Sequence, residues 1–221
     1  ANTAKGFSIV EFTTDGVTSG TVAHGLGVQP QLIIGKTRNH DVSWYVQSPL
    51  LAANLSLILN ATDTAYNPGI NHWNDTHPTT SVFSVGGYMA DHADLTNPST
   101  KIVYAFANVE GYSKVGTFVG NGNADGPFVY TGGRVQWLLL KNASASENWY
   151  VWDNARETFN IMNERQHPNL AIADQTSSGR GLDFLSNGFK IRGSDSSVNG
   201  SGNTIIYLAI MQQPFKFSNA R

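Results

Sequence analysis

"PQLIIGKTRNHDVSWYV" (residues 30–46) and "VQWLLLKNASASENWYV" (residues 135–151) are segments of equal length that lie 105 residues apart in a chain of 221. Each begins with an apolar run that ends in a lysine, Lys36 or Lys141, and each closes on Trp-Tyr-Val. Short apolar runs separated by polar loops are typical of strands in antiparallel β proteins. The pair predicts two copies of one β-rich unit.

Further landmarks repeat in the same order. "GFSIVEF" from Gly6 resembles "GYSKVGTF" from Gly111, again at an offset of 105. "VFSVGGY" (residues 82–88) aligns with "DFLSNGF" (residues 183–189) at an offset of 101. Landmarks that keep their order while the offset drifts indicate tandem copies with insertions and deletions in their loops.

We therefore expect an all-β fold of two antiparallel β-sandwich repeats, jelly-roll or lectin-like, packed together. Their predicted bounds are residues 1–109 and 110–221. The alternative is one intertwined, concanavalin-like sandwich. Residues 48–60 fit either a turn or two of helix or a loop. The predicted strands are 8–13, 31–36, 43–47, 82–85 and 102–107 in the first copy, and 116–120, 135–141, 148–152, 182–185 and 204–211 in the second.

The composition excludes several classes of function. Charged residues make up 14% of the chain, and the formal net charge is −2. Nucleic-acid binding needs clustered lysine and arginine, so we expect no nucleic-acid partner. The absence of cysteine excludes disulfides and thiolate chemistry. No apolar run approaches the roughly 18–20 residues that span a bilayer, and we expect no membrane insertion.

One loop of the first copy combines side chains that suit a ligand. "NHWNDTH" (residues 71–77) offers imidazoles, amides, a carboxylate and an indole, which could stack on a sugar ring while its neighbours bond hydroxyls. The alternative is a surface loop ordered by a buried tryptophan and by Asx turns. The second copy has no equivalent loop, which frees this one from the constraints of the repeat. The candidate ligand residues are Asn71, His72, Trp73, Asn74, Asp75 and His77.

Catalytic groups are scarce. Asp153 and Glu157 could form the carboxylate pair of a glycoside hydrolase, but an exposed loop with an ordinary ion pair explains them more simply. The matched Trp44 and Trp149 are expected in the core or between sheets. The matched lysines are expected to snorkel at strand ends or to neutralise a carboxylate. We predict no enzyme activity, no catalytic residue and no cofactor.

"GNGNADG" (residues 120–126) resembles the opening of a calcium loop. A calcium loop also needs more acidic ligands and a distal bidentate glutamate, which do not follow here. The aligned turn of the first copy, "FTTDG" (residues 12–16), lacks the alternating Asn123 and Asp125. We therefore expect a tight hairpin turn and no metal site.

The combined phrases resemble a tandem-repeat domain of tailed bacteriophages, found in tail fibres and other virion proteins. The resemblance is carried by "TVAHGLGVQPQLIIGKTR", "PTTSVFSVGG", "YAFANVEGYSKVGTFVGNGNADGPFVYTGG", "NWYVWDNAR", "LDFLSNGFKIRG" and "PFKFSNAR". It covers Gly6 to Arg221. The second copy departs from it at Val135, where proline is usual and where the first copy has Pro30. The closing "YLAIMQQPF" is also less alanine-rich than usual.

The resemblance implies a β-rich module on the exterior of a virion, in the tail or on the capsid. We expect a tail-fibre or adsorption module that contributes to binding a host glycan or receptor. The alternatives are a purely structural virion protein, such as a head decoration or a fibre spacer, and a polysaccharide depolymerase domain. The expected partners are other virion proteins, a host cell-surface polysaccharide and further copies of the chain, with a trimer favoured because trimers are usual for fibres.

Overall fold

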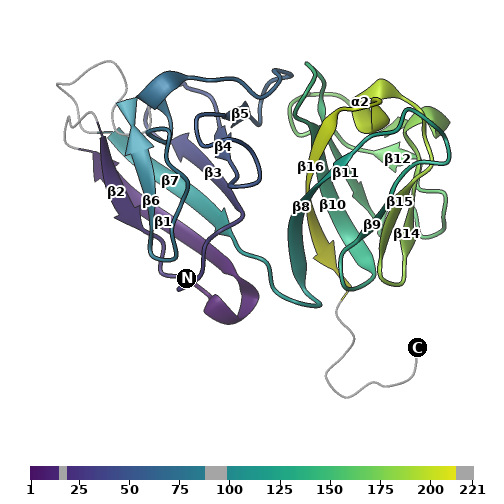
Figure 1. Cartoon of the computed structure of the whole chain (residues 1–221), viewed down its shortest axis with the longest axis horizontal. Coiled ribbons are helices and arrows are strands. Elements are labelled where there is room, and N and C mark those ends of the chain that lie inside the picture. The colour runs from purple at the N-terminus through teal and green to yellow at the C-terminus, as the bar shows by residue number, and fades with distance from the viewer. Residues whose placement is uncertain (15–18, 88–98, 213–221) are drawn as a thin grey trace.

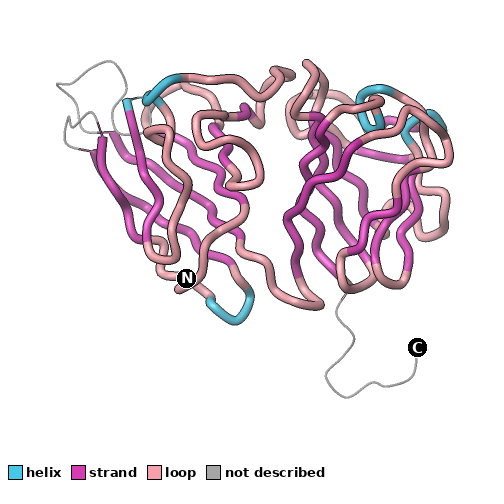
Figure 2. The backbone as a smooth tube through the Cα atoms, in the orientation of Figure 1, coloured by secondary structure: helices cyan, strands magenta, loops and turns pink. Residues whose placement is uncertain are grey.

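The computed structural model describes residues 1–14, 19–87 and 99–212. The fold is all-β with antiparallel sheets, as predicted. Figure 2 shows that strands form both halves of the molecule and that the short helices lie at their ends. No helix among the described residues is long and apolar enough to cross a membrane. The helices within the described ranges are η1 (Thr3–Lys5), η2 (Gly69–Asn71), η3 (Ser178–Arg180) and α2 (Ser196–Asn199).

The first half forms two sheets. Its strands in the described residues are β1 (Phe7–Thr14), β2 (Ser19–Ala23), β3 (Leu32–Thr37), β4 (Tyr45–Gln47), β5 (Leu57–Ile58), β6 (Val82–Gly86) and β7 (Ser99–Phe106). The larger sheet has the order β1-β7-β3-β4-β5, and the smaller pairs β2 with β6. Residues 48–60 form turns and the short β5 rather than a helix.

The strands of the second half in the described residues are β8 (Ser113–Val119), β9 (Phe128–Tyr130), β10 (Val135–Asn142), β11 (Trp149–Asp153), β12 (Glu164–Arg165), β13 (Gln175–Thr176), β14 (Leu182–Leu185), β15 (Gly188–Ile191) and β16 (Thr204–Met211). They form three sheets, with the orders β11-β10-β16-β8, β14-β15-β9 and β12-β13. All ten predicted strands overlap observed ones.

The two halves repeat one topology. The order β1-β7-β3-β4 corresponds strand by strand to β8-β16-β10-β11, and β2-β6 corresponds to β9-β15. Phe12 and Phe83 have ring centroids 6.0 Å apart, and so do Phe118 and Phe189. Phe189 is therefore the counterpart of Phe83, and the alignment that paired Phe83 with Phe184 is wrong. Every strand pairing among the described residues stays within one half, which does not fit the intertwined alternative.

Four sheets are layered through the molecule: β2-β6, the large sheet of the first half, the large sheet of the second half, and β14-β15-β9 (Figure 1). The large sheet of each half is therefore covered on both faces. Side chains alternate across a strand, so neighbouring residues of β3 serve different cores. Ile33 packs in the core of the first sandwich, whereas Leu32 and Ile34 pack against the second. In β10, Leu138 packs in its own core and Leu139 packs against the first sandwich. The continuous apolar runs of both strands follow from this burial on two faces.

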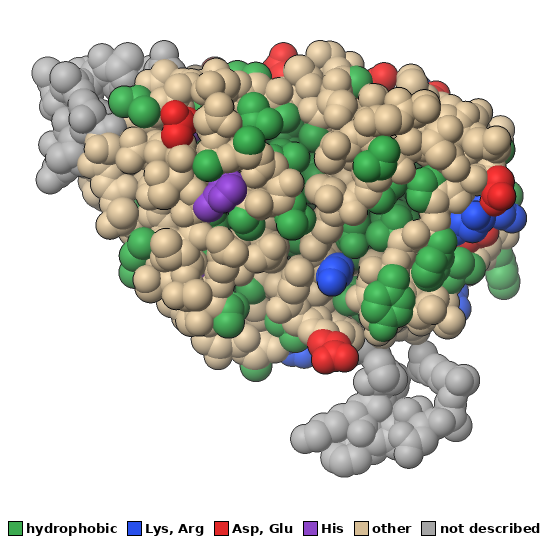
Figure 3. Space-filling model, viewed as in Figure 1, with side chains coloured by type: hydrophobic (Ala, Val, Ile, Leu, Met, Phe, Trp, Pro, Cys, Tyr) green, Lys and Arg blue, Asp and Glu red, His purple; other side chains and the backbone are tan. Residues whose placement is uncertain are grey.

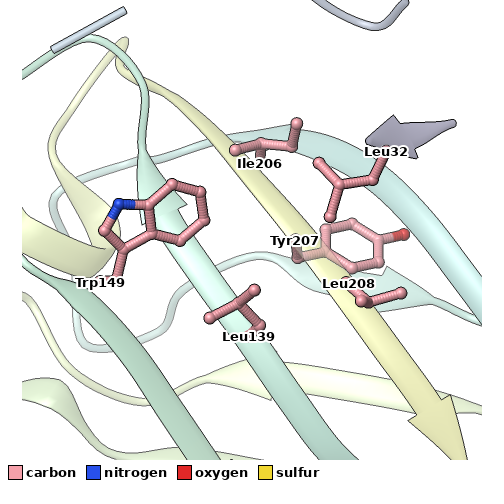
Figure 4. A pocket seen from close by; sticks show the side chains of 6 residues that line it. All are labelled: Leu32, Leu139, Trp149, Ile206, Tyr207 and Leu208. Carbon is pink, nitrogen blue, oxygen red and sulfur yellow. The ribbon is translucent and has the colours of Figure 1, made fainter. Parts of the chain in front are cut away.

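The cluster between the large sheets holds the two halves together. Figure 4 shows Leu32 of the first sandwich near Leu139, Trp149, Ile206, Tyr207 and Leu208 of the second, around a gap with no room for a water molecule. Both halves contribute buried aliphatic residues to the same cluster. The halves are therefore joined through a shared dry core as well as through the backbone.

The matched lysines close their own hairpins and form no ion pair within the described part of the chain. Lys36 Nζ donates to the carbonyl oxygens of His40 and Val42, in the loop after β3. Lys141 Nζ donates to those of Ala145 (3.4 Å) and Glu147 (2.6 Å), in the loop after β10. Lys141 is fully buried, so its ammonium group is bound by carbonyl oxygens; it neither snorkels to water nor pairs with a carboxylate of the described residues, and the expectation is wrong for this lysine.

Candidate functional site

The predicted ligand loop does not present its aromatic and imidazole rings to solvent together. Trp73 is 2% exposed and packs in the core of the first sandwich, where its ring meets that of Phe83 edge to face at 6.3 Å. His72 is 3% exposed. A sugar ring cannot reach an indole in this position, so the burial of Trp73 does not support its role as a stacking platform.

His72 is held by the sandwich. Its Nδ1 lies 3.0 Å from Ser56 Oγ, and its ring centroid lies 3.9 Å from that of Tyr45. Burial lowers the pKa of His72 to about 4, because the charged form loses its hydration. The imidazole is therefore neutral at pH 7. Its contacts are those of a packed core side chain.

The other predicted residues serve turns of the loop. Asn71 Nδ2 donates to a proline carbonyl of its own turn at 2.8 Å, and His77 Nε2 lies 3.0 Å from a leucine carbonyl of a neighbouring loop. Asn74 and Asp75 have φ of 53° and 47°, the left-handed region that Asn and Asp tolerate. The described residues contain no group of three or more His, Asp or Glu that could hold a metal ion.

The second sandwich has a counterpart of His72 after all. Tyr150 matches Tyr45 at the offset of 105, and its ring lies 4.8 Å from that of His167. His167 Nδ1 lies 3.2 Å from the carbonyl oxygen of Trp149. A histidine packed on this tyrosine is thus a feature of both copies. This likeness favours a structural role for both rings.

Asp153 and Glu157 are also occupied. Asp153 forms an ion pair with Arg156 and accepts two backbone amide hydrogens of the following turn. Glu157 Oε2 accepts hydrogen bonds from the backbone nitrogens of Asn163 and Glu164. Both carboxylates hold their own loop in shape, which favours the simpler of the two interpretations made from the sequence.

The "GNGNADG" loop is a network of Asx turns, and the expectation of a tight hairpin is wrong, because the flanking strands β8 and β9 lie in different sheets. Asn121 Oδ1 accepts from the nitrogen of Asn123, and Asn123 Oδ1 accepts from that of Asp125. Asn199, fully buried, donates to Asn121 Oδ1 and accepts from the nitrogen of Asn121. Asp125 pairs with Lys190 at 2.7 Å. The side-chain oxygens that suggested calcium are thus bound by groups of the protein itself. The aligned turn at residues 15–16 lies outside the described residues.

A groove in the second sandwich is the best candidate site. It lies where the loops after β9, β11 and β14 meet the segment joining the two halves, and its volume is about 820 Å³. Small-molecule sites commonly measure about 300–1,000 Å³. The groove is lined by glycines and by polar side chains: Gly111, Gly132, Gly133, Arg134, Asn154, Thr158, Ser186 and Gln212.

Two exposed aromatic residues flank this groove. The Tyr130 hydroxyl lies 3.9 Å from the position that a Cβ on Gly132 would take, and the side chain is 64% exposed. Phe159 directly follows the groove residue Thr158 and is 82% exposed. Figure 3 shows hydrophobic side chains on the surface over β9 and β14. Exposed aromatic rings beside a polar groove indicate a binding surface.

The backbone of β9 sets the direction of Tyr130. Val129 is buried in the core, so alternation directs Phe128 and Tyr130 outward. Tyr130 pairs with Gly188 of the neighbouring strand, which adds no side chain beside the ring. A Cβ at Gly188 would lie 2.1 Å from the Val129 carbonyl oxygen, so glycine is required there.

The groove lies outside the residues that the sequence singled out. The available signal was the triplet "FVY" (residues 128–130), in which one buried residue between two aromatics exposes both if the segment is a strand. A segment of three residues between "GP" and "TGG" is too short to show a clear strand pattern.

The comparisons with known proteins add a family. The chain matches no curated protein and no solved structure. Residues 1–214 match the family described as Domain of unknown function (DUF7483), and the chain belongs to that family.

Proposed function

We propose that the chain is a non-enzymatic glycan-binding module on the exterior of a bacteriophage virion, in a tail fibre or adsorption apparatus. The observation that carries the glycan-binding part is the polar groove with the exposed Tyr130 at its edge. The virion location rests on the resemblance of the repeated phrases to phage domains.

The lining of the groove suits a sugar. A pyranose ring has an apolar face of C–H groups, which an exposed tyrosine ring can cover, and hydroxyl groups around its rim. Asn154, Thr158, Ser186 and Gln212 supply neutral donors and acceptors for such hydroxyls. We expect a single site of this kind to bind weakly. Several copies on one particle would bind strongly through effective concentration.

Binding without catalysis is proposed because of what lines the groove. Among the described residues, its lining includes no aspartate, glutamate or histidine. Hydrolysis of a glycosidic bond ordinarily uses two carboxyl groups on either side of the scissile bond. Asp153 and Glu157 are engaged in their own loop, as described above.

A glycan array with the purified chain tests the proposal, followed by binding to host cells. We expect Tyr130→Ala to weaken binding by about two- to tenfold, because a stacking contact with an aromatic ring is worth about 0.5–1.5 kcal/mol. Ile172→Ala is the matched control, since Ile172 is 53% exposed in the same sandwich and does not line the groove. Failure to bind any polysaccharide or host cell would contradict the proposal.

A rigid structural role is the second candidate. The dry cluster between the large sheets joins the two sandwiches firmly, as a spacer in a fibre or a head decoration would require. Locating the chain in a reconstruction of the virion tests this role. A position with the groove buried under other virion proteins would favour it over glycan binding.

A further inference from the structure

We propose that the groove selects saccharides that carry a carboxylate, and that Arg134 binds this group. The inference rests on the proposed glycan-binding function and names the class of sugar. It depends on the position of Arg134, on its lack of a partner among the described residues, and on the neutral side chains of the described residues that line the groove around it.

Arg134 differs from the other arginines that the structure describes. It is exposed, it lines the groove, and its side chain forms no hydrogen bond or ion pair within the described part of the chain. Four of the others each form an ion pair with a carboxylate, and Arg165 is buried and donates to backbone carbonyls. The paired arginines are Arg38, Arg156, Arg180 and Arg192.

The backbone fixes where Arg134 begins. Its carbonyl oxygen accepts a hydrogen bond of 2.7 Å from the nitrogen of Gln212, another groove residue. Gly133 precedes it, and a Cβ there would lie 3.2 Å from Met211 Cγ, so the chain passes close to β16 at this point. The guanidinium therefore extends from an anchored segment at the groove wall.

No carboxylate of the described residues forms an ion pair with Arg134. Asp153, next to the groove residue Asn154, is paired with Arg156. Asp183, on β14, is paired with Arg192 at 3.0 Å. Glu110, adjacent to Gly111, is exposed and forms no ion pair in the part of the chain that the structure describes. Among the described residues that line the groove, Arg134 is the one charged side chain, and the others are neutral.

The chemistry of this arrangement favours a sugar acid. A guanidinium offers parallel N–H donors that match the two oxygens of a carboxylate. Tyr130 can cover the ring of the same sugar or of its neighbour, while the neutral side chains bond hydroxyls. A uronic acid residue in a chain of sugars combines these features. Sulfate and phosphate esters share the charge but not the planar shape.

The test compares oligogalacturonate with its methyl ester, which keeps the sugar backbone and removes the charge. Affinities are measured by titration calorimetry for the wild type, Arg134→Gln, Arg134→Lys and Tyr130→Ala. We expect the wild type to prefer the acid by about fivefold, with the preference falling at high salt, because a solvent-exposed ion pair contributes up to about 1 kcal/mol. Arg134→Gln should bind both forms equally, and Arg134→Lys should keep part of the preference.

Each outcome bears on a different statement. Equal affinity of the wild type for acid and ester, with Tyr130→Ala weakening both, overturns the role of Arg134 and leaves glycan binding standing. Retention of the acid preference in Arg134→Gln also overturns it. If the wild type binds neither the acid nor the ester nor any glycan on a neutral array, the proposed function is overturned together with this inference. A sulfated oligosaccharide that binds more tightly than the carboxylate overturns the selection of sugar acids.

Discussion

The indole nitrogen of Trp149 donates a hydrogen bond of 2.8 Å to the carbonyl oxygen of Ile58, across the boundary between the two sandwiches. Trp149 starts β11 of the second sandwich, and Ile58 ends β5 of the first. The backbone nitrogen of Ala65 adds a bond of 2.9 Å to the carbonyl oxygen of Ala143 nearby. Its counterpart Trp44 also packs at the edge of the cluster between the sandwiches, but among the described residues only Trp149 donates an indole hydrogen bond to the other sandwich.

Trp149→Phe should lower the free energy of unfolding by about 2 kcal/mol. The change removes buried ring volume and leaves the Ile58 carbonyl without its donor, and each loss costs on the order of 1 kcal/mol. Trp44→Phe is the matched control, because Trp44 is only partly buried at the edge of the shared cluster. Urea unfolding followed by circular dichroism measures both. An equal loss in the two variants would contradict the inter-sandwich role of Trp149.

Lys141 makes stability depend on pH in the alkaline range. Burial lowers its pKa from 10.5 to about 8 in the folded chain. Between pH 8 and 10.5 the unfolded state binds more protons at this site than the folded state, so this lysine contributes a rise in stability with pH. The difference in unfolding free energy between wild type and Lys141→Met isolates this contribution, because other titrating groups are common to both. A difference that stays flat from pH 7.5 to 10.5 would contradict it.

The sequence predicts strands well where the chain repeats. The apolar runs of residues 31–36 and 135–141 are continuous because both faces of β3 and β10 are buried, and their repetition confirms the pattern. The strands that were missed are short or poorly apolar, such as β9 with three residues and β12 with two. These strands exist because neighbouring strands pair with them, and single-sequence patterns do not show long-range pairing.

The candidate site was harder to predict for a related reason. Polar, histidine-rich character in residues 71–77 suggested exposure, yet tertiary packing takes Trp73 and His72 into the first sandwich. The groove instead gathers loop residues that are far apart in sequence, from Gly111 to Gln212. Only Tyr130 carried a local signal, and it depends on knowing that residues 128–130 are a strand.

His72 should make the protein sensitive to acid. Its folded pKa of about 4 lies below the ordinary 6.5, so the unfolded state binds a proton at a higher pH than the folded state does. The contribution to stability is complete above pH 6.5 and is lost as pH falls toward 4, by about 3 kcal/mol in all. Urea unfolding at pH 7, 5 and 4 measures the loss.

His72→Gln provides the comparison for this acid sensitivity. The variant should be less stable at pH 7, because the contact with Tyr45 is lost, but its stability should fall less steeply toward pH 4. The pKa values of His24 and His167 are also lowered, chiefly by burial, so some slope remains in the variant. If the free energy of unfolding falls equally steeply with pH in the wild type and in His72→Gln, groups other than His72 cause the acid sensitivity.

Asn199→Ala should destabilise the second sandwich by about 2–4 kcal/mol. The fully buried amide donates to the carbonyl oxygens of Asn123 and Gly193 and accepts from the nitrogen of Asn121, and its loss removes these hydrogen bonds. Asn123→Ala is the control, since the exposed Asn123 side chain accepts one amide bond, and we expect a loss under about 1 kcal/mol. Thermal and urea unfolding give both values. Because the turn is held by Asn199 rather than by an ion, adding Ca²⁺ should restore neither variant, and a restored melting temperature would show that the loop holds a metal.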